Sequence, residues 1–147
     1  MNSTLEQIGK NAREAEAVLR VLSVNEKNKL LATAADYLMA DMNLLLEANA
    51  TDMETARENN MPIALQDRLQ LTESRIAQMA EGLRQIAGLE DPVGEVLYMK
   101  QRPNGLMIGQ KRVPLGVIGI IYESRPNVTA DAFGLCFKAG NVVILRG

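Results

Sequence analysis

The side chains that could carry out chemistry in this chain are restricted in type. The 147 residues include no histidine and a single cysteine, Cys136, so the commonest metal ligand and the usual general base are missing. Chemistry must therefore use carboxylates, amides, hydroxyls, basic side chains or backbone groups. The turn Ser124-Arg-Pro-Asn127 offers a hydroxyl, a guanidinium and a carboxamide close together. Arg125 could bind an anionic substrate, and the alternative for it is a solvated surface charge.

The elements that flank this turn form a predicted βαβ unit. Residues 115–121 are a nearly unbroken apolar run rich in β-branched residues, which predicts a parallel strand covered on both faces. Pro126 breaks that run, and residues 128–138 have the apolar spacing of a helix. Gly140 suits the end of this helix, and residues 142–145 predict a second buried strand. The turn then lies at a carboxyl strand end, where open α/β sheets bind nucleotides.

Helices are predicted upstream of this unit, and their starts are marked by capping residues. The pattern S/T-x-x-E, in which the two side chains bond each other's free backbone N–H, occurs at Ser3 with Glu6, Ser23 with Glu26, and Thr51 with Glu54. Thr72 opens a further helix that ends at Gly88. The apolar stripes predict helices through residues 5–22 and 30–45, a shorter one over 52–58, and one facing the core through Ile76, Met79, Ala80, Leu83 and Ile86.

The segment between the helices and the βαβ unit has an extended pattern. Residues 96–102 and 106–112 flank Pro103-Asn-Gly105, a turn signal that joins antiparallel strands. This hairpin is too polar to be a core element. Charged side chains of the helical part, such as Lys27, are interpreted as solvated helix faces, and the eight methionines as core filler.

Composition excludes several function classes. A net charge of −2, from 16 basic and 18 acidic residues, gives no electrostatic basis for binding nucleic acid or an anionic membrane. The longest apolar run is too short to span a bilayer, which takes about 20 residues, and the first residues do not resemble a signal peptide. A single cysteine excludes an intrachain disulfide. We therefore expect a cytoplasmic protein with neither a metal site nor a nucleic-acid partner.

Several separated motifs carry a family resemblance. Val113-Pro-Leu-Gly-Val-Ile-Gly-Ile-Ile before the turn, and Lys138-Ala-Gly-Asn before the second strand, resemble the aldehyde dehydrogenase superfamily. Tyr122-Glu-Ser-Arg-Pro-Asn-Val-Thr-Ala-Asp-Ala resembles its γ-glutamyl phosphate reductase family, also called glutamate-5-semialdehyde dehydrogenases. Upstream segments also match in order, namely Leu45-Leu-Glu-Ala-Asn-Ala-Thr-Asp52, Asp67-Arg-Leu-Gln-Leu-Thr72, Gly82-Leu-Arg-Gln-Ile-Ala87 and Asp91-Pro-Val-Gly94.

The resemblance implies an α/β fold and a division of the chain into three segments. Residues 1–93 would be a helical part of the cofactor-binding domain, and residues 94–113 a β-hairpin arm that forms part of an oligomerisation surface. Residues 114–147 would be the first, truncated βαβ unit of a Rossmann-like dinucleotide-binding domain. The chain resembles an amino-terminal fragment, because the family's catalytic cysteine would lie beyond Gly147.

The resemblance also implies functional residues. Superfamily members have an asparagine in the turn after this strand whose amide stabilises an oxyanion, a role that a neutral, fixed donor suits, and Asn127 is the candidate. An Asx-turn or helix cap is the alternative for Asn127, and an ungapped count from the strand puts Arg125 at that position instead. Ser124 and Arg125 would lie near the nicotinamide. Arg146 would contact the adenosine ribose, where a guanidinium suits the 2′-phosphate of NADP.

The implied activity is the NADPH-dependent reduction of L-glutamyl 5-phosphate to glutamate-5-semialdehyde and phosphate, in proline biosynthesis. The fragment itself would be inactive, because Cys136 lies among apolar neighbours without a base and is interpreted as structural. Implied partners are further copies of the chain and glutamate 5-kinase. The alternatives are another member of the aldehyde dehydrogenase superfamily and a non-catalytic helical module that associates with itself.

Overall fold

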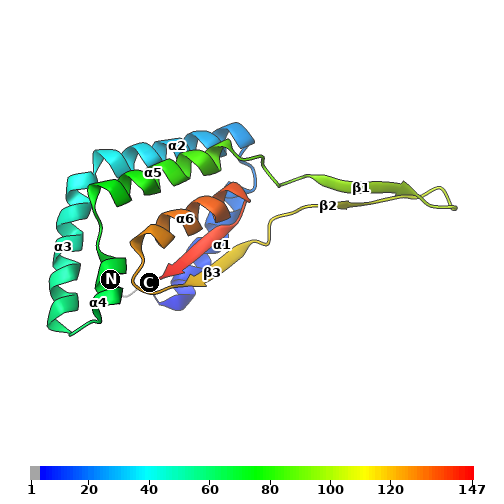
Figure 1. Ribbon diagram of the computed structural model, residues 1–147. Helices are drawn as coiled ribbons and strands as arrows, with labels where there is room; N and C mark the ends of the chain where they lie inside the picture. Colours follow the sequence, from blue (N-terminus) through cyan, green and yellow to red (C-terminus); the bar gives the residue numbers. More distant parts are fainter. Residues whose placement is uncertain (1–3) are drawn as a thin grey trace.

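The computed structural model describes residues 4–147, which form a helical layer, a small parallel sheet and a projecting hairpin (Figure 1). The helices are α1 (Leu5–Leu19), α2 (Val24–Ala40), α3 (Met42–Glu58), α4 (Ile63–Leu69), α5 (Glu73–Gly88) and α6 (Pro126–Lys138). The strands are β1 (Val96–Gln101), β2 (Met107–Lys111), β3 (Val117–Ile121) and β4 (Val142–Arg146). The chain therefore runs from helices through the hairpin into one β3-α6-β4 unit.

The core lies where α2, α5 and α6 pack together. Leu31 and Ala35 of α2 meet Ala80 and Leu83 of α5 in one buried cluster, and aromatic residues of α6 pack against it. The five apolar positions predicted to face inward on α5 are all buried. Caps explain where two of these helices begin: Ser23 and Glu26 form the predicted capping box of α2, and Thr72 caps α5.

The predicted boundaries of the other helices need correction. Ser3 lies outside the described residues, and Thr4 is the residue that caps α1. The capping box predicted at Thr51 is wrong, because Thr51 lies inside α3 and donates from its hydroxyl to the Glu47 carbonyl. Helix α3 runs without a break from Met42 to Glu58, so no helix begins at Thr51 for the pattern to cap. The stripe predicted over residues 30–45 is interrupted instead at Asp41, between α2 and α3.

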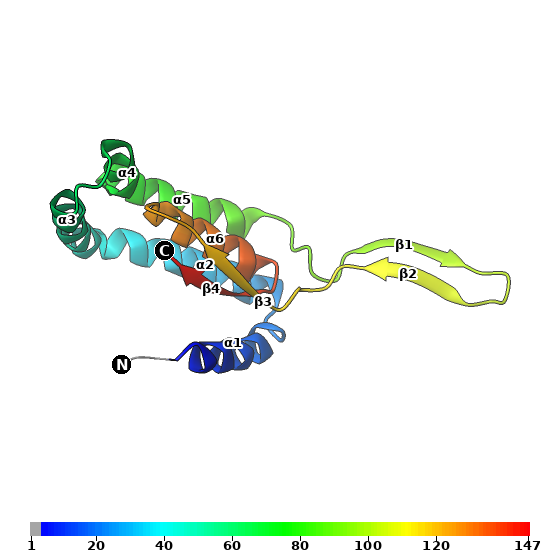
Figure 2. The same cartoon turned by 90° about the horizontal axis from the view of Figure 1, so that it is seen from below.

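The predicted βαβ unit is present. Strands β3 and β4 pair in parallel, α6 lies on one face of this sheet, and α1 lies on the other (Figure 2). Gly140 follows α6 with a φ of 75°, and a Cβ there would lie 2.9 Å from Pro114 Cγ. Asn141 then joins the strands, because its Oδ1 accepts hydrogen bonds from the backbone N–H groups of Leu115 and Gly116 at 2.6 and 3.0 Å.

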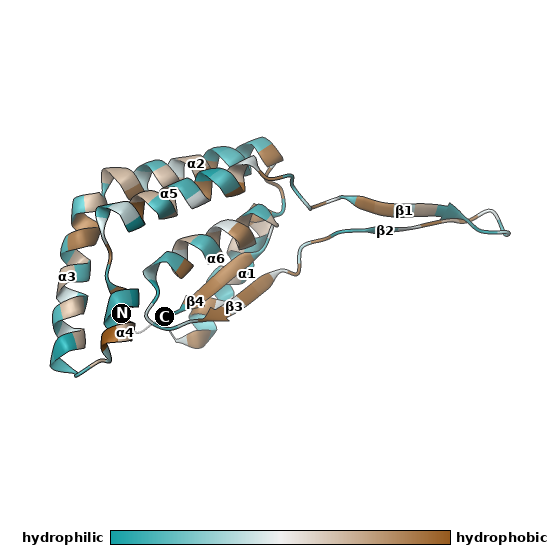
Figure 3. Cartoon of the chain, viewed as in Figure 1, coloured by the Kyte–Doolittle hydropathy of each residue, from teal (hydrophilic) through white to brown (hydrophobic). Residues whose placement is uncertain are grey.

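The sheet is less covered than its sequence predicts. Apolar residues dominate both strands, as their colouring by hydropathy shows (Figure 3), and β4 is half-buried for most of its length. Along β3, however, exposed and half-buried residues alternate, and Ile121 is 86% exposed. The prediction that this strand is covered on both faces is therefore wrong for the described chain, because α1 and α6 pack mainly against β4 and leave alternate residues of β3 exposed.

The hairpin projects away from the rest of the molecule (Figures 1 and 2). Strands β1 and β2 pair antiparallel, as predicted, and every residue of both strands is exposed. Their exposed side chains include large apolar ones such as Leu97, Met99 and Ile108. Because a lone two-stranded hairpin is only marginally stable in water, this arm depends on interactions beyond its own strands.

A buried polar cluster joins α2, α6 and the start of the arm. Lys27, expected to be solvated, is 3% exposed. Its Nζ donates to the Lys138 carbonyl at 3.0 Å and forms an ion pair with Asp91. The Lys138 ammonium is buried beside it and donates to Asn28 and to the Ala87 carbonyl. Burial is the main cause that lowers the pKa of Lys138. The interpretation of Lys27 as a surface charge is wrong, because its partners are distant in sequence.

Candidate functional site

The candidate site begins with the turn between β3 and α6. Strand pairing continues for one more bond, in which the Tyr122 backbone N–H donates to the Arg146 carbonyl at 2.9 Å. Ser124 then has a φ of 48°, which is uncommon for a residue other than glycine and concentrates at functional sites. Pro126 is the first residue of α6, where its missing N–H removes no helical hydrogen bond. The turn therefore delivers the chain directly into the helix.

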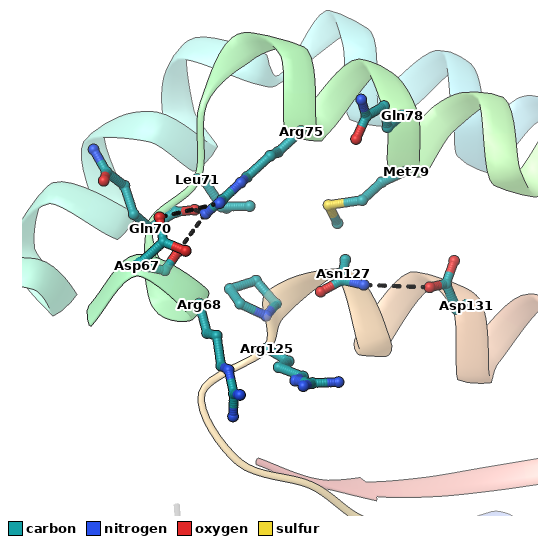
Figure 4. A pocket seen from close by; sticks show the side chains of 11 residues that line it. Asp67, Arg68, Gln70, Leu71, Arg75, Gln78, Met79, Arg125, Asn127 and Asp131 are labelled. Atoms are coloured by element: carbon teal, nitrogen blue, oxygen red, sulfur yellow. Dashed lines mark hydrogen bonds and ion pairs between the residues drawn. The ribbon is translucent and has the colours of Figure 1, made fainter. Parts of the chain in front are cut away.

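An open pocket of about 460 Å³ lies beside this turn. It is lined by the start of α6, the connection between α4 and α5, and the first turns of α5 (Figure 4). Asn49 fixes the connection from behind, because its Nδ2 donates to the Leu69 carbonyl at 2.9 Å and its Oδ1 accepts from the Leu71 N–H at 2.7 Å. Helix α3, which carries Asn49, thus holds this wall of the pocket in place.

Guanidinium groups dominate the charge of this pocket, but they differ in their availability. Arg75 is occupied, because it donates to the Gln70 carbonyl at 2.6 Å and to the Asp67 carbonyl and carboxylate. Arg68 and Arg125 also line the pocket, and within residues 4–147 neither forms an ion pair. The pocket therefore offers two free cationic forks, which suit carboxylate or phosphate oxygens.

Asn127 is exposed and lines the same pocket. It is the second residue of α6, after Pro126, and its side chain caps no backbone group. Arg125 occupies the N-cap position and makes no side-chain cap either. The only hydrogen bond of the Asn127 amide within the described residues is a long one, 3.5 Å to Asp131 Oδ2. The capping alternative for Asn127 is therefore wrong, and its amide is free to donate elsewhere.

The remaining candidates lie apart from the pocket lining. Ser124 is half-buried in the turn, and Arg146 is exposed at the end of β4, where it is the register partner of Ile121. Both lie at the carboxyl edge of the parallel strands. The structure thus brings Arg125 and Asn127 together in the pocket but leaves Ser124 and Arg146 outside its walls.

Cys136 is buried on α6, as the sequence predicts for a structural cysteine. Burial raises the pKa of its thiol, so the thiolate needed for nucleophilic attack is disfavoured.

Among residues 4–147, no three or more His, Cys, Asp or Glu side chains gather in a way that could hold a metal ion. No helix in the same range is long and apolar enough to cross a membrane.

Sequence reasoning missed most residues of the pocket, including two charged side chains that form no ion pair within residues 4–147. Arg68 and Asp131 both line it, and neither was a candidate. Both belong to segments that carry the family resemblance, so a motif signal existed. Their roles were hidden because Arg68 comes from α4 and Asp131 from α6, and only folding brings these helices to one pocket.

Comparison with known proteins places this site in a family. The chain is 59% identical over 144 residues to γ-glutamyl phosphate reductase of Lachnospira eligens, an alignment that covers 98% of this chain and 35% of the relative. The enzyme of the same name from Enterococcus faecalis is 55% identical over 143 residues and is covered over 34% of its length. No family model matches the chain.

Solved structures give the same result. A crystal structure of γ-glutamyl phosphate reductase from Thermotoga maritima matches with a TM-score of 0.89 at 47% identity, covering 94% of this chain and 33% of that one. The Saccharomyces cerevisiae protein of the same name matches with a TM-score of 0.91 at 37% identity, covering 99% of this chain and 37% of that one. The chain thus spans about a third of these proteins, and its sequence and fold match the amino-terminal part of γ-glutamyl phosphate reductases.

Proposed function

We propose that this chain is the amino-terminal portion of an NADPH-dependent reductase that converts L-glutamyl 5-phosphate to glutamate-5-semialdehyde and phosphate in proline biosynthesis. The observation that carries the proposal is 54–59% identity to reductases of that name over nearly the whole chain. The pocket beside the β3-α6 turn supports it, because Arg68 and Arg125 offer free guanidinium groups to a substrate that carries a carboxylate and a phosphate.

The nucleophile of this reaction is proposed to lie outside the chain. Cys136 is buried and the pKa of its thiol is raised, so it does not suit attack on an acyl phosphate. A cysteine from the remainder of the enzyme would attack the acyl carbon, release phosphate and form a thioester. Covalent catalysis of this kind divides one difficult displacement into easier steps.

Asn127 is proposed to stabilise the oxyanion formed at the acyl carbon. Its amide is exposed in the pocket and has only one long hydrogen bond within the described chain. It stands on the first turn of a helix whose far end is buried, so the donor is held in place before charge develops. Arg125, one residue before the helix, would hold the substrate phosphate or carboxylate from the same side of the pocket.

The carboxyl edge of β3 and β4 is the proposed binding site for the dinucleotide. Arg146 is exposed there, and its guanidinium has no ion pair among residues 4–147, so it could bind the 2′-phosphate that distinguishes NADP from NAD. Ser124 would contact the nicotinamide half from the turn. When bound, NADPH would supply the hydride that reduces the acyl group to the aldehyde.

The exposed arm supports a proposal of homo-oligomers. All residues of β1 and β2 are exposed, although several are large and apolar, and an added strand from another copy would pair their free edges.

Glutamate 5-kinase is a further proposed partner, because it would supply the labile acyl phosphate. We place these reactions in the cytoplasm, as befits a biosynthetic enzyme.

The proposal is tested with a hybrid reductase, in which this chain replaces the amino-terminal third of the Lachnospira eligens relative. The hybrid is expected to oxidise glutamate-5-semialdehyde in the presence of phosphate and NADP, whereas the chain alone is expected to have no activity. The unmodified relative serves as the control for folding and assay. A hybrid that melts at the same temperature as the relative but does not turn over would overturn the proposed function.

A further inference from the structure

One of the two carboxylates in the pocket has no cationic partner within the described residues. Asp131 lines the wall formed by α6, one helical turn beyond Asn127 (Figure 4). Three arginines line the same pocket, and yet Asp131 forms no ion pair with any of them. Its hydrogen bond within the described chain is the long contact of 3.5 Å from the neutral Asn127 amide. The Asp131 carboxylate and the guanidinium groups of Arg68 and Arg125 therefore line the same pocket without pairing with one another.

The other acidic residue of the pocket differs from Asp131. The Asp67 carboxylate accepts from the Arg75 guanidinium at 3.3 Å, so its charge is compensated within the protein. Asp131 is also less exposed than Asp67, because it is half-buried against α5, where its Oδ1 would lie 3.5 Å from a Cβ at Gly82. A half-buried carboxylate without a cationic partner favours a ligand that brings its own positive charge.

We propose that Asp131 binds the α-ammonium group of the amino-acid substrate, while the free guanidiniums of Arg68 and Arg125 bind its anionic groups. Asp131 then determines specificity, because it distinguishes an amino acid from a simple carboxylic acid of the same length. The inference rests on the proposed function and adds to it the residue that recognises the amino group.

The test compares two aldehydes that differ only in the amino group. Glutamate-5-semialdehyde carries the α-ammonium, and 5-oxopentanoate has the same chain and carboxylate without it. In the hybrid reductase, Asp131→Asn is expected to reduce the preference for the first over the second by about tenfold, because it removes one charge-assisted hydrogen bond. The loss should appear in KM for glutamate-5-semialdehyde, and Asp131→Glu should restore part of the preference.

Two variants in the same pocket serve as matched controls. Asp67→Asn makes the same chemical change at a carboxylate that is already paired with Arg75. The preference for glutamate-5-semialdehyde over 5-oxopentanoate should therefore be unchanged. Arg68→Gln removes a charge that would bind the carboxylate present in both aldehydes, so KM should rise for both of them together. Thermal unfolding of each variant checks that the hybrid is folded.

The outcomes separate this inference from the function on which it rests. If the unmodified hybrid is active but Asp131→Asn leaves the preference unchanged, the role of Asp131 is wrong and the proposed function stands. An equal loss of preference in all three variants would indicate general loosening of the pocket and would also overturn the role. A folded but inactive parent hybrid overturns the proposed function, and this inference with it.

Discussion

The two halves of helix α6 contrast in burial although they form one continuous helix. Toward its start, Asn127 is exposed and Asp131 is half-buried, and both line the pocket. Toward its end, Gly134, Cys136 and Lys138 are all buried. The contrast shows how one element can be open for binding at one end and anchored in the core at the other.

The buried half is packed without spare room. A Cβ at Gly134 would lie 2.8 Å from Leu83 Cδ2 and 2.9 Å from Ile86 Cδ1, which is closer than side chains normally approach. The end of the helix is held by Lys138, whose carbonyl accepts from Lys27 and whose ammonium donates to the Ala87 carbonyl. A rigid element of this kind positions polar groups more accurately than a loop does.

The largest expected effect comes from breaking the anchored end. Lys27→Met removes one partner of the buried ion pair with Asp91 and leaves that carboxylate without compensation. We expect the free energy of unfolding to fall by about 3–5 kcal/mol, measured by urea denaturation of the chain. Lys29→Met, at an exposed position of the same helix, is the control. Equal stability of the two variants would show that the buried pair contributes nothing.

The next effect is expected at the open end and should be catalytic. Asn127→Ala in the hybrid reductase should lower kcat by about 10²-fold or more, which is the range for loss of one oxyanion donor. Because Asn127 is exposed and caps no backbone group, the midpoint of thermal unfolding should hardly change. A variant with normal kcat would remove Asn127 from the chemistry and leave Arg125 as the candidate in the turn.

A smaller effect is expected for cofactor preference at the neighbouring strand end. Arg146→Ala in the hybrid should raise KM for NADPH and narrow the preference for NADPH over NADH by about tenfold, since a charged hydrogen bond to a phosphate contributes about 1.5–3 kcal/mol. Initial rates with each cofactor measure this ratio. If the binding of both cofactors weakens equally, Arg146 contacts the ribose that they share or supports the fold.

The smallest catalytic effect is expected at Cys136 in the anchored half. Cys136→Ser in the hybrid should leave turnover within a few fold, because the thiol is buried and not the nucleophile. Burial raises the pKa of this thiol, so the folded state keeps it protonated at pH values where the unfolded chain already forms thiolate. At a pH in this range, alkylation of Cys136 by iodoacetamide should therefore be slow in the native chain and fast in the chain unfolded by urea. Loss of nearly all activity in Cys136→Ser would instead identify it as the nucleophile.

Local signals in the sequence predicted the elements of α6 and its neighbours well. Gly140 after the last turn of α6 is predicted from the residues next to it, and so is the apolar spacing of α5. Helix α6 begins at Pro126, however, ahead of the start predicted at residue 128. The same reasoning was wrong at Thr51, where a capping pattern lies inside a helix. A short motif indicates which backbone groups a side chain could cap, but it does not indicate whether a helix begins at that residue. The three-segment division of the chain remains a prediction.

By itself, the sequence determined the βαβ unit, the hairpin, the helix caps at Ser23 and Thr72, and the family resemblance, because each depends on residues close together along the chain. Tertiary structure alone decided that Lys27 is buried, since its partner carbonyl lies 111 residues away. It also decided which polar groups share a pocket. Arg68 and Asp131 line the same pocket only because α4 packs against α3, while α3 and α6 both pack against α5. Packing of helices that are distant in sequence depends on shape and burial that no local pattern encodes.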